Sequence, residues 1–237
     1  MRIFVSPLRA GEATITGDEH HYLSRVRRAR VGDAIELVDG AGLRAMAVIA
    51  AIGDAATTLT VGAPAAEVAA GPRVRVLVPL IKGDRMDYCL EKLVEVGADE
   101  IVVWPAARAV VVLDPAKRDG RLAKFRALVQ AAARQSGRAA VPTVAIAETL
   151  AAALAAVPAS AAGSSRFVLD PAAGTADVAF GADDVTLVSG PEGGFAPAER
   201  DSFAAAEFAP LGLGPRILRA ETAPVVGVAL VRAATRS

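Results

Sequence analysis

The alternation of apolar, strand-like runs with helical patterns over residues 74–234 constrains the fold of this chain more than any other feature. Such alternation predicts an α/β fold, in which a parallel sheet carries helices on both faces. The expected strands are residues 74–80, 101–104, 167–169, 185–188 and 208–211, and the expected helices are residues 84–96, 115–135, 150–157, 199–206 and 222–234. Asp84 and Thr222 are the expected N-caps of the first and last helices, and Gly97 is expected to end the first.

The first 62 residues follow a different pattern, in which short β-favourable runs are separated by Gly-Asp and Asp-Gly turns. The runs are residues 2–5, 34–38, 43–50 and 57–61, with one helix expected over residues 20–30. This pattern predicts a small β-barrel. Residues 63–72 contain few bulky side chains and are bounded by prolines, which is typical of a linker. We therefore expect two domains, over residues 1–70 and 71–237.

Two segments rich in glycine and proline, residues 190–195 and 211–223, each follow a strand-like run and lead into a helix. In parallel sheets ligands bind at the carboxyl ends of the strands, and glycine lets the backbone approach a ligand closely. The two segments therefore predict a pocket built mostly of main chain. They contain neither a P-loop nor a dinucleotide fingerprint, and Ser189 lacks the frame of a hydrolase nucleophile.

The composition narrows the class of protein. The chain has 26 basic and 26 acidic residues, and most of the basic ones are arginine, which suits phosphate contacts but also follows from a compositional bias. Cys89 is the only cysteine, and the two histidines, His20 and His21, are adjacent, so a metal site is not expected. No run approaches the roughly 18 apolar residues of a membrane helix, and no apolar leader opens the chain. We expect a cytoplasmic protein without a metal ion.

The glycine-rich segments also carry a family resemblance. Residues 187–195 read LVSGPEGGF and residues 213–223 read LGPRILRAETA; residues 20–28 (HHYLSRVRR) and 82–87 (KGDRMD) add to the match. Together they strongly resemble the SPOUT superfamily of knotted methyltransferases and, within it, the bacterial 16S rRNA uridine-N3 methyltransferase family. The resemblance implies a PUA-like, RNA-binding β-barrel, a C-terminal domain with a deep trefoil knot, S-adenosylmethionine as cofactor, and a homodimer. The implied substrate is 16S rRNA or the small ribosomal subunit, and the implied product is N3-methyluridine.

This resemblance implies that the two glycine-rich segments hold S-adenosylmethionine. Backbone groups and apolar side chains would bind its adenine and amino-acid ends. The expected cofactor-binding residues are Leu169, Gly190, Pro191, Glu192, Gly193, Gly194, Leu211, Leu213, Gly214, Ile217, Leu218 and Ala223. The alternative for the glycines is that they only form tight turns.

Three charged residues of the second segment are the expected catalytic groups. Uridine N3 becomes nucleophilic when its proton leaves, so a general base or a cation that stabilises the resulting negative charge would help. Arg219 and Arg216 are candidates for the cation, or contacts to a flanking phosphate. Glu221 is a candidate base, or forms only a helix cap or an ion pair.

Basic side chains near the N-terminus are the expected RNA contacts, although they could form only a solvated helix face. They are Arg9, Arg25, Arg27, Arg28 and Arg30. His20 and His21 are read as structural or adjacent to RNA.

Two other functions stay open: a SPOUT enzyme that acts on tRNA or on a ribose 2′-hydroxyl, and a non-catalytic assembly factor that retains the fold.

Overall fold

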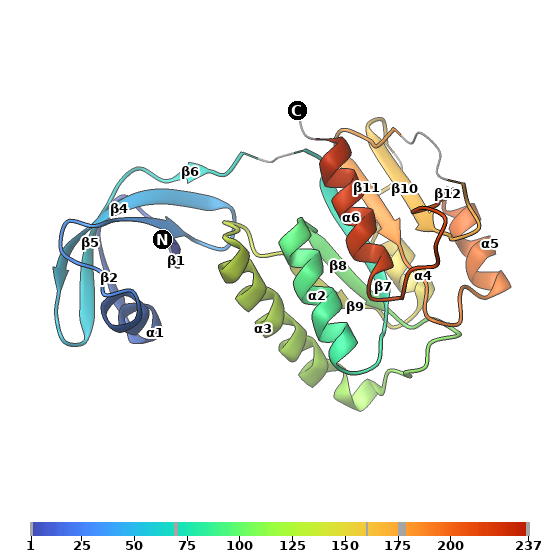
Figure 1. The fold of residues 1–237 in the computed structure, drawn as a ribbon, viewed down its shortest axis with the longest axis horizontal. Coiled ribbons are helices and arrows are strands. Elements are labelled where there is room, and N and C mark those ends of the chain that lie inside the picture. Colours follow the sequence, from blue (N-terminus) through green and yellow to red (C-terminus); the bar gives the residue numbers. More distant parts are fainter. Residues whose placement is uncertain (1, 69–70, 160, 175–178, 236–237) are drawn as a thin grey trace. The chain divides into compact units, whose positions relative to one another are not determined.

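The computed structural model describes residues 2–68, 71–159, 161–174 and 179–235 and divides the chain into two compact units (Figure 1). The first unit comprises residues 1–68 together with 133–141, and the second comprises residues 69–132 and 142–237. The boundary near residue 69 lies in the segment read as a linker. Residues 133–141, which the sequence had assigned to the second domain, pack with the first unit instead.

The second unit contains a six-stranded sheet in which every neighbouring pair of strands is parallel. The strand order is β12-β10-β11-β7-β8-β9. The strands are β7 (Arg73–Pro79), β8 (Glu100–Trp104), β9 (Thr143–Ile146), β10 (Ser164–Leu169), β11 (Asp184–Val188) and β12 (Ala209–Leu211). The central strands β7, β8 and β11 are buried over nearly their whole length, as expected for strands covered on both faces.

Helices cover both faces of this sheet (Figure 1). On one face α6 (Ala223–Ala234) lies against α2 (Asp84–Val96) and contacts β7, β10 and β11. On the other face α4 (Leu150–Ala155) and α5 (Pro197–Ala205) pack over an aromatic cluster that includes Trp104, Phe195 and Phe203. The α/β fold expected from the alternating pattern is confirmed. Among the described residues, no helix has the length and apolar character needed to cross a membrane.

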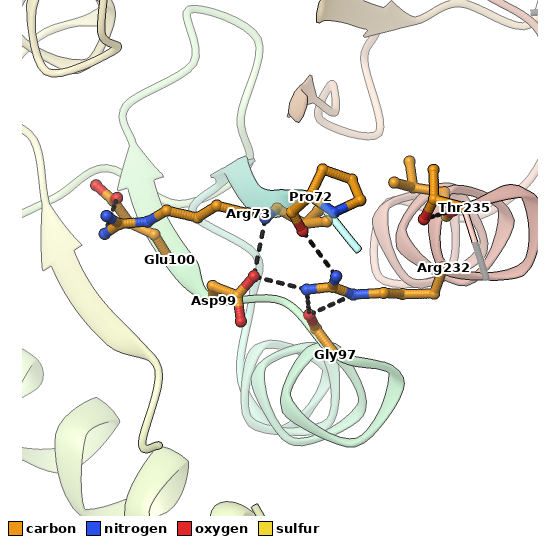
Figure 2. Close-up of polar contacts among 9 residues, drawn as sticks. Pro72, Arg73, Gly97, Asp99, Glu100, Arg232 and Thr235 are labelled. Carbon is orange, nitrogen blue, oxygen red and sulfur yellow. Dashed lines mark hydrogen bonds and ion pairs between the residues drawn. The ribbon is translucent and has the colours of Figure 1, made fainter. Parts of the chain in front are cut away.

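Arg232, in the last turn of α6, ties three parts of the second unit together (Figure 2). Its guanidinium donates to Gly97 O at 3.0 and 2.6 Å and to Pro72 O at 2.7 Å, and it contacts Asp99 Oδ2 at 2.6 Å. Asp99 Oδ2 also accepts a hydrogen bond from the backbone N–H of Val74. This network joins α6 to the end of α2 and to the start of β7.

The first unit is a curled sheet with the strand order β1-β3-β4-β5-β2, and β6 pairs with β4. The strands are β1 (Arg2–Phe4), β2 (Gly11–Thr16), β3 (Ala34–Val38), β4 (Leu43–Ile52), β5 (Ala56–Val61) and β6 (Ala65–Ala66). Alternate side chains such as Ile35, Leu37 and Leu59 form its core. The last turn of α3 (Arg118–Ser136) belongs to this unit, where Arg134 contacts Glu19 at 3.0 Å.

Several local expectations were wrong. The helix expected over residues 20–30 begins earlier, as α1 (Gly17–His21), continues as a π-helical turn (Tyr22–Val26), and has ended before Arg28, whose φ is +50°. Strands β2, β6 and β9 were missed because short strands with few bulky apolar residues give a weak alternating signal, and β6 lies in the segment read as a linker. Gly83, and not Asp84, is the N-cap of α2. Thr222 is the N-cap residue of α6, as expected, but its side chain makes no capping hydrogen bond. Gly97 ends α2 with a φ of +105°, as expected.

Candidate functional site

The two glycine-rich segments leave two strands, β11 and β12, at the carboxyl end of the parallel sheet. Residues 190–195 follow β11 and residues 212–222 follow β12, and β10 lies between these two strands. Leu169 ends β10, and the following residue, Asp170, donates its N–H to Leu211 O at 3.0 Å. All three strands run parallel, so their carboxyl ends meet at this edge, which is where open α/β sheets bind ligands.

A pocket opens beside the second segment. Its lining residues are Leu169, Asp170, Pro171, Leu211, Leu213, Gly214, Arg216, Leu218 and Ala223. Six of the expected cofactor-binding residues and the expected catalytic Arg216 therefore share one pocket. Ile217 does not belong to it, because its side chain is 86% exposed. The remaining expected residues, Gly190, Pro191, Glu192, Gly193 and Gly194, form the neighbouring segment.

Gly193 and Gly214 show why the backbone needs glycine in these segments. A Cβ added to Gly193 would lie 2.9 Å from both Cβ and O of Arg108, in the loop after β8. Gly214 has a φ of +113°, a conformation that side chains disfavour. The glycines therefore do form tight turns, and they also bring the backbone close to its neighbours.

A buried carboxylate that the sequence did not single out holds the first segment in place. Glu199, in the first turn of α5, accepts hydrogen bonds at 2.7 Å from the backbone N–H groups of Ala107 and Ala196. It thereby joins the loop after β8 to the end of the first segment. In the same loop, the Arg108 guanidinium donates a hydrogen bond to Gly193 O at 3.5 Å. The only available signal was an acidic residue after Pro197, which is an ordinary helix start.

Charged groups converge between the two segments. Glu221 is 6% exposed, and its carboxylate lies 3.8 Å from Arg85 Nη1 and 3.9 Å from Arg219 Nη1. Arg85 also contacts Glu192 Oε1 at 3.1 Å.

Burial, with a smaller contribution from the charge of Glu221, raises the pKa of the Cys89 thiol to about 12. Cys89 is therefore an unreactive core residue, as its place in α2 predicted.

Some buried polar atoms at this edge have no hydrogen-bond partner within the described structure. They are Ser189 Oγ, directly after β11, Trp104 Nε1, at the end of β8, and Glu221 Oε2. Buried polar groups are normally satisfied, so such atoms indicate a place where water or a ligand completes the bonding. The edge thus combines apolar walls, exposed backbone and unsatisfied polar groups.

Asp170 adds a fixed negative charge to the pocket. Burial opposes its ionisation, but the N–H of Ala172 and the guanidinium of Arg200 outweigh this effect and lower its pKa. The carboxylate is therefore charged at neutral pH. It offers an acceptor to a hydroxyl or ammonium group of a ligand.

The candidate RNA contacts lie in the first unit. Arg9, Arg25, Arg27, Arg28 and Arg30 are all exposed, and in the described part of the chain none of the five forms an ion pair. Arg25 lies in the π-helical turn, and Arg27, Arg28 and Arg30 follow it in an irregular segment, so these side chains do not form the face of a regular helix. His20 is buried and bonds to Thr57 Oγ1 at 2.8 Å, whereas His21 is exposed.

Residues 69–232 match the family model described as RNA methyltransferase domain, and residues 15–58 match the RNA methyltransferase PUA domain. The chain belongs to this RNA methyltransferase family. A protein from Mycobacterium tuberculosis named ribosomal RNA small subunit methyltransferase E is 35% identical, over 92% of this chain and 85% of its own length. The Bacillus subtilis protein of the same name is 28% identical over 92% and 88%. The family resemblance drawn from the glycine-rich motifs is thus confirmed.

Solved structures agree with this assignment. The small subunit methyltransferase E from Neisseria gonorrhoeae, bound to S-adenosyl methionine, has a TM-score of 0.79 and 27% identity and covers 98% of this chain and 96% of its own. A second, from Porphyromonas gingivalis and called a probable rRNA-methyltransferase, has a TM-score of 0.76 and 26% identity and covers 94% and 93%. Both likenesses extend over more than nine tenths of this chain.

Proposed function

We propose that this RNA methyltransferase transfers a methyl group from S-adenosylmethionine to N3 of a uridine in 16S rRNA. The observation that carries the proposal is the pocket that Leu169 lines together with residues of the second glycine-rich segment, Ala223 among them. Relatives named as small subunit rRNA methyltransferases support the substrate, and the neighbour bound to S-adenosyl methionine supports the cofactor. The motifs in residues 187–195 and 213–223 support N3 of uridine through their resemblance.

The residues at the sheet edge fit this cofactor. Apolar side chains of the pocket, Leu169, Leu211, Leu213 and Leu218, would pack against its adenine, and backbone N–H and C=O groups would bind the edges of the ring. The carboxylate of Asp170 would accept hydrogen bonds from polar groups of the ligand. The bound cofactor supplies an electrophilic methyl group on a sulfonium, and the protein positions it in line with the attacking nitrogen.

Positive charge beside the pocket would promote loss of the N3 proton. Arg219 is 82% exposed at its side chain and Arg216 lines the pocket, so both guanidiniums can reach an incoming base. A cation near O2 or O4 of the uracil stabilises the negative charge that develops there. Glu221 is the candidate proton acceptor. Its contacts with Arg85 and Arg219 equally suit the role of a buried counter-ion.

The first unit would bind the RNA through its exposed arginines, Arg9, Arg25, Arg27, Arg28 and Arg30. Arginine contacts to phosphate position an RNA without specifying its sequence.

We further propose that the protein works in the cytoplasm as a homodimer and that its C-terminal domain forms a deep trefoil knot. Sedimentation velocity at micromolar concentration tests the dimer, and a monomer would contradict it.

Deletion of the gene tests the reaction directly. Mass spectrometry of small-subunit rRNA from the deletion strain should show the loss of one N3-methyluridine, and a plasmid copy of the gene should restore it. Retention of every methyluridine would reject the proposal. Loss of a ribose 2′-O-methyl group, or of a tRNA methyl group, would reassign the substrate. Unchanged modification together with no binding of S-adenosylmethionine in calorimetry would favour a non-catalytic RNA-binding protein.

A further inference from the structure

Arg85 lies between the two glycine-rich segments without belonging to either. It stands in the first turn of α2, directly after the carboxyl end of β7, and β7 is the neighbour of β11 in the sheet. Its guanidinium contacts one carboxylate from each segment: Glu192 at 3.1 Å and Glu221 at 3.8 Å. These two carboxylates come from loops that follow different strands, and β10 separates those strands.

The contact between Arg85 and Glu221 matters because the Glu221 carboxylate is buried. A buried carboxylate without an opposite charge is strongly destabilising. Only two cations contact Glu221 in the described structure, and one of them, Arg219, is 82% exposed at its side chain. Solvent screens an exposed partner, so its effect is small. Arg85 is 42% exposed at its side chain and is the better-shielded partner.

We propose that Arg85 is a positioning residue that holds the two glycine-rich segments in one rigid arrangement beside the pocket by pairing with Glu192 on one side and Glu221 on the other. The cofactor role of that pocket rests on the proposed function, whereas the lock that Arg85 forms does not. A rigid pocket binds its ligand without the cost of ordering the loops at the moment of binding. Loss of Arg85 should therefore loosen both segments and weaken binding through their disorder.

Hydrogen exchange in the ligand-free protein tests the lock. Backbone amides of residues 192–196 and of residues 212–222 should exchange about tenfold faster in Arg85→Ala, because local opening costs less when the bridging charge is lost. Arg85→Lys retains one point charge and should restore part of the protection. Arg126 on α3 is exposed and provides the matched control, so Arg126→Ala should exchange like the wild type in both segments.

A double-mutant cycle shows whether the two ends of the lock act together. Glu192→Gln removes one contact and stands in an exposed turn, so it folds even if Arg85→Ala does not. If Arg85 joins the segments, Glu192→Gln should also accelerate exchange in residues 212–222, where it has no contact of its own. The double variant should then exchange no faster than Arg85→Ala. Faster exchange confined to one segment, or strictly additive effects, would overturn the lock.

Calorimetry with S-adenosylmethionine then separates this inference from the proposed function. We expect about tenfold weaker binding by Arg85→Ala and partial rescue by Arg85→Lys. If the wild type fails to bind, the proposed function is rejected, and the exchange data still decide the lock. If the wild type binds and Arg85→Ala binds equally tightly with unchanged exchange, the lock is rejected, and the proposed function stands.

Discussion

Single side chains decide the chemistry at this sheet edge, and Arg219 is the one we expect to matter most for turnover. Its side chain is 82% exposed, its Nη1 lies 3.9 Å from Glu221 Oε1, and it is not among the residues that line the pocket. Arg219→Ala should therefore lower kcat by about a hundredfold and change the cofactor dissociation constant by less than about threefold. Methyl transfer to rRNA and calorimetry measure the two quantities. Equal loss of both would indicate a cofactor contact instead.

Glu199 also acts as a single side chain. Its carboxylate accepts hydrogen bonds from the backbone N–H groups of Ala107 and Ala196. In Glu199→Gln, an NH₂ group faces one of these donors, so a buried bond is lost and replaced by a repulsive contact. The free energy of unfolding should fall by about 2 kcal/mol. Glu207→Gln, at an exposed position, should change it by less than about 0.5 kcal/mol. Urea denaturation measures both, and equal values would show that Glu199 contributes nothing by its bonds.

Arg232 illustrates how one side chain connects whole elements. Its guanidinium holds the end of α2, the start of β7 and the last turn of α6 together, and the side chain is only 17% exposed. Arg232→Ala removes these bonds and leaves the carbonyls of Gly97 and Pro72 without this donor. It should destabilise the second unit by about 3 kcal/mol. Arg126→Ala is again the control, and a similar thermal midpoint for both variants would contradict the expectation.

The elements also show where sequence patterns are informative. The helix α2 was predicted with both of its bounds correct, because Met86, Leu90 and Leu93 repeat on one face and Gly97 ends the helix. The central strands were recognised because valine, leucine and isoleucine make up most of each of them. The π-helical turn over Tyr22–Val26 could not be predicted, since its i→i+5 bond (Arg27 N–H to Tyr22 O) leaves no mark on the hydrophobic pattern.

At the scale of the whole molecule, charge is balanced, with 26 basic and 26 acidic residues. RNA affinity must then come from a local patch and should depend strongly on salt. Each phosphate contact to single-stranded RNA contributes about −0.7 to the slope of log affinity against log salt concentration. Replacing Arg25 and Arg28 together by alanine should reduce the slope by about 1.4. Filter binding at several salt concentrations measures it, and an unchanged slope would place the RNA contact elsewhere.

Local residue order determined much of this protein: the α/β class, the PUA-like first part, the two glycine-rich segments and the family to which they belong. These properties rest on short-range patterns, which a sequence displays directly. Only the tertiary structure decided that residues 133–141 join the first unit, that Glu199 holds a loop 92 residues away, and that Arg85 faces Glu192 and Glu221. Such contacts depend on distances between atoms that chain folding brings together, and no local pattern encodes them.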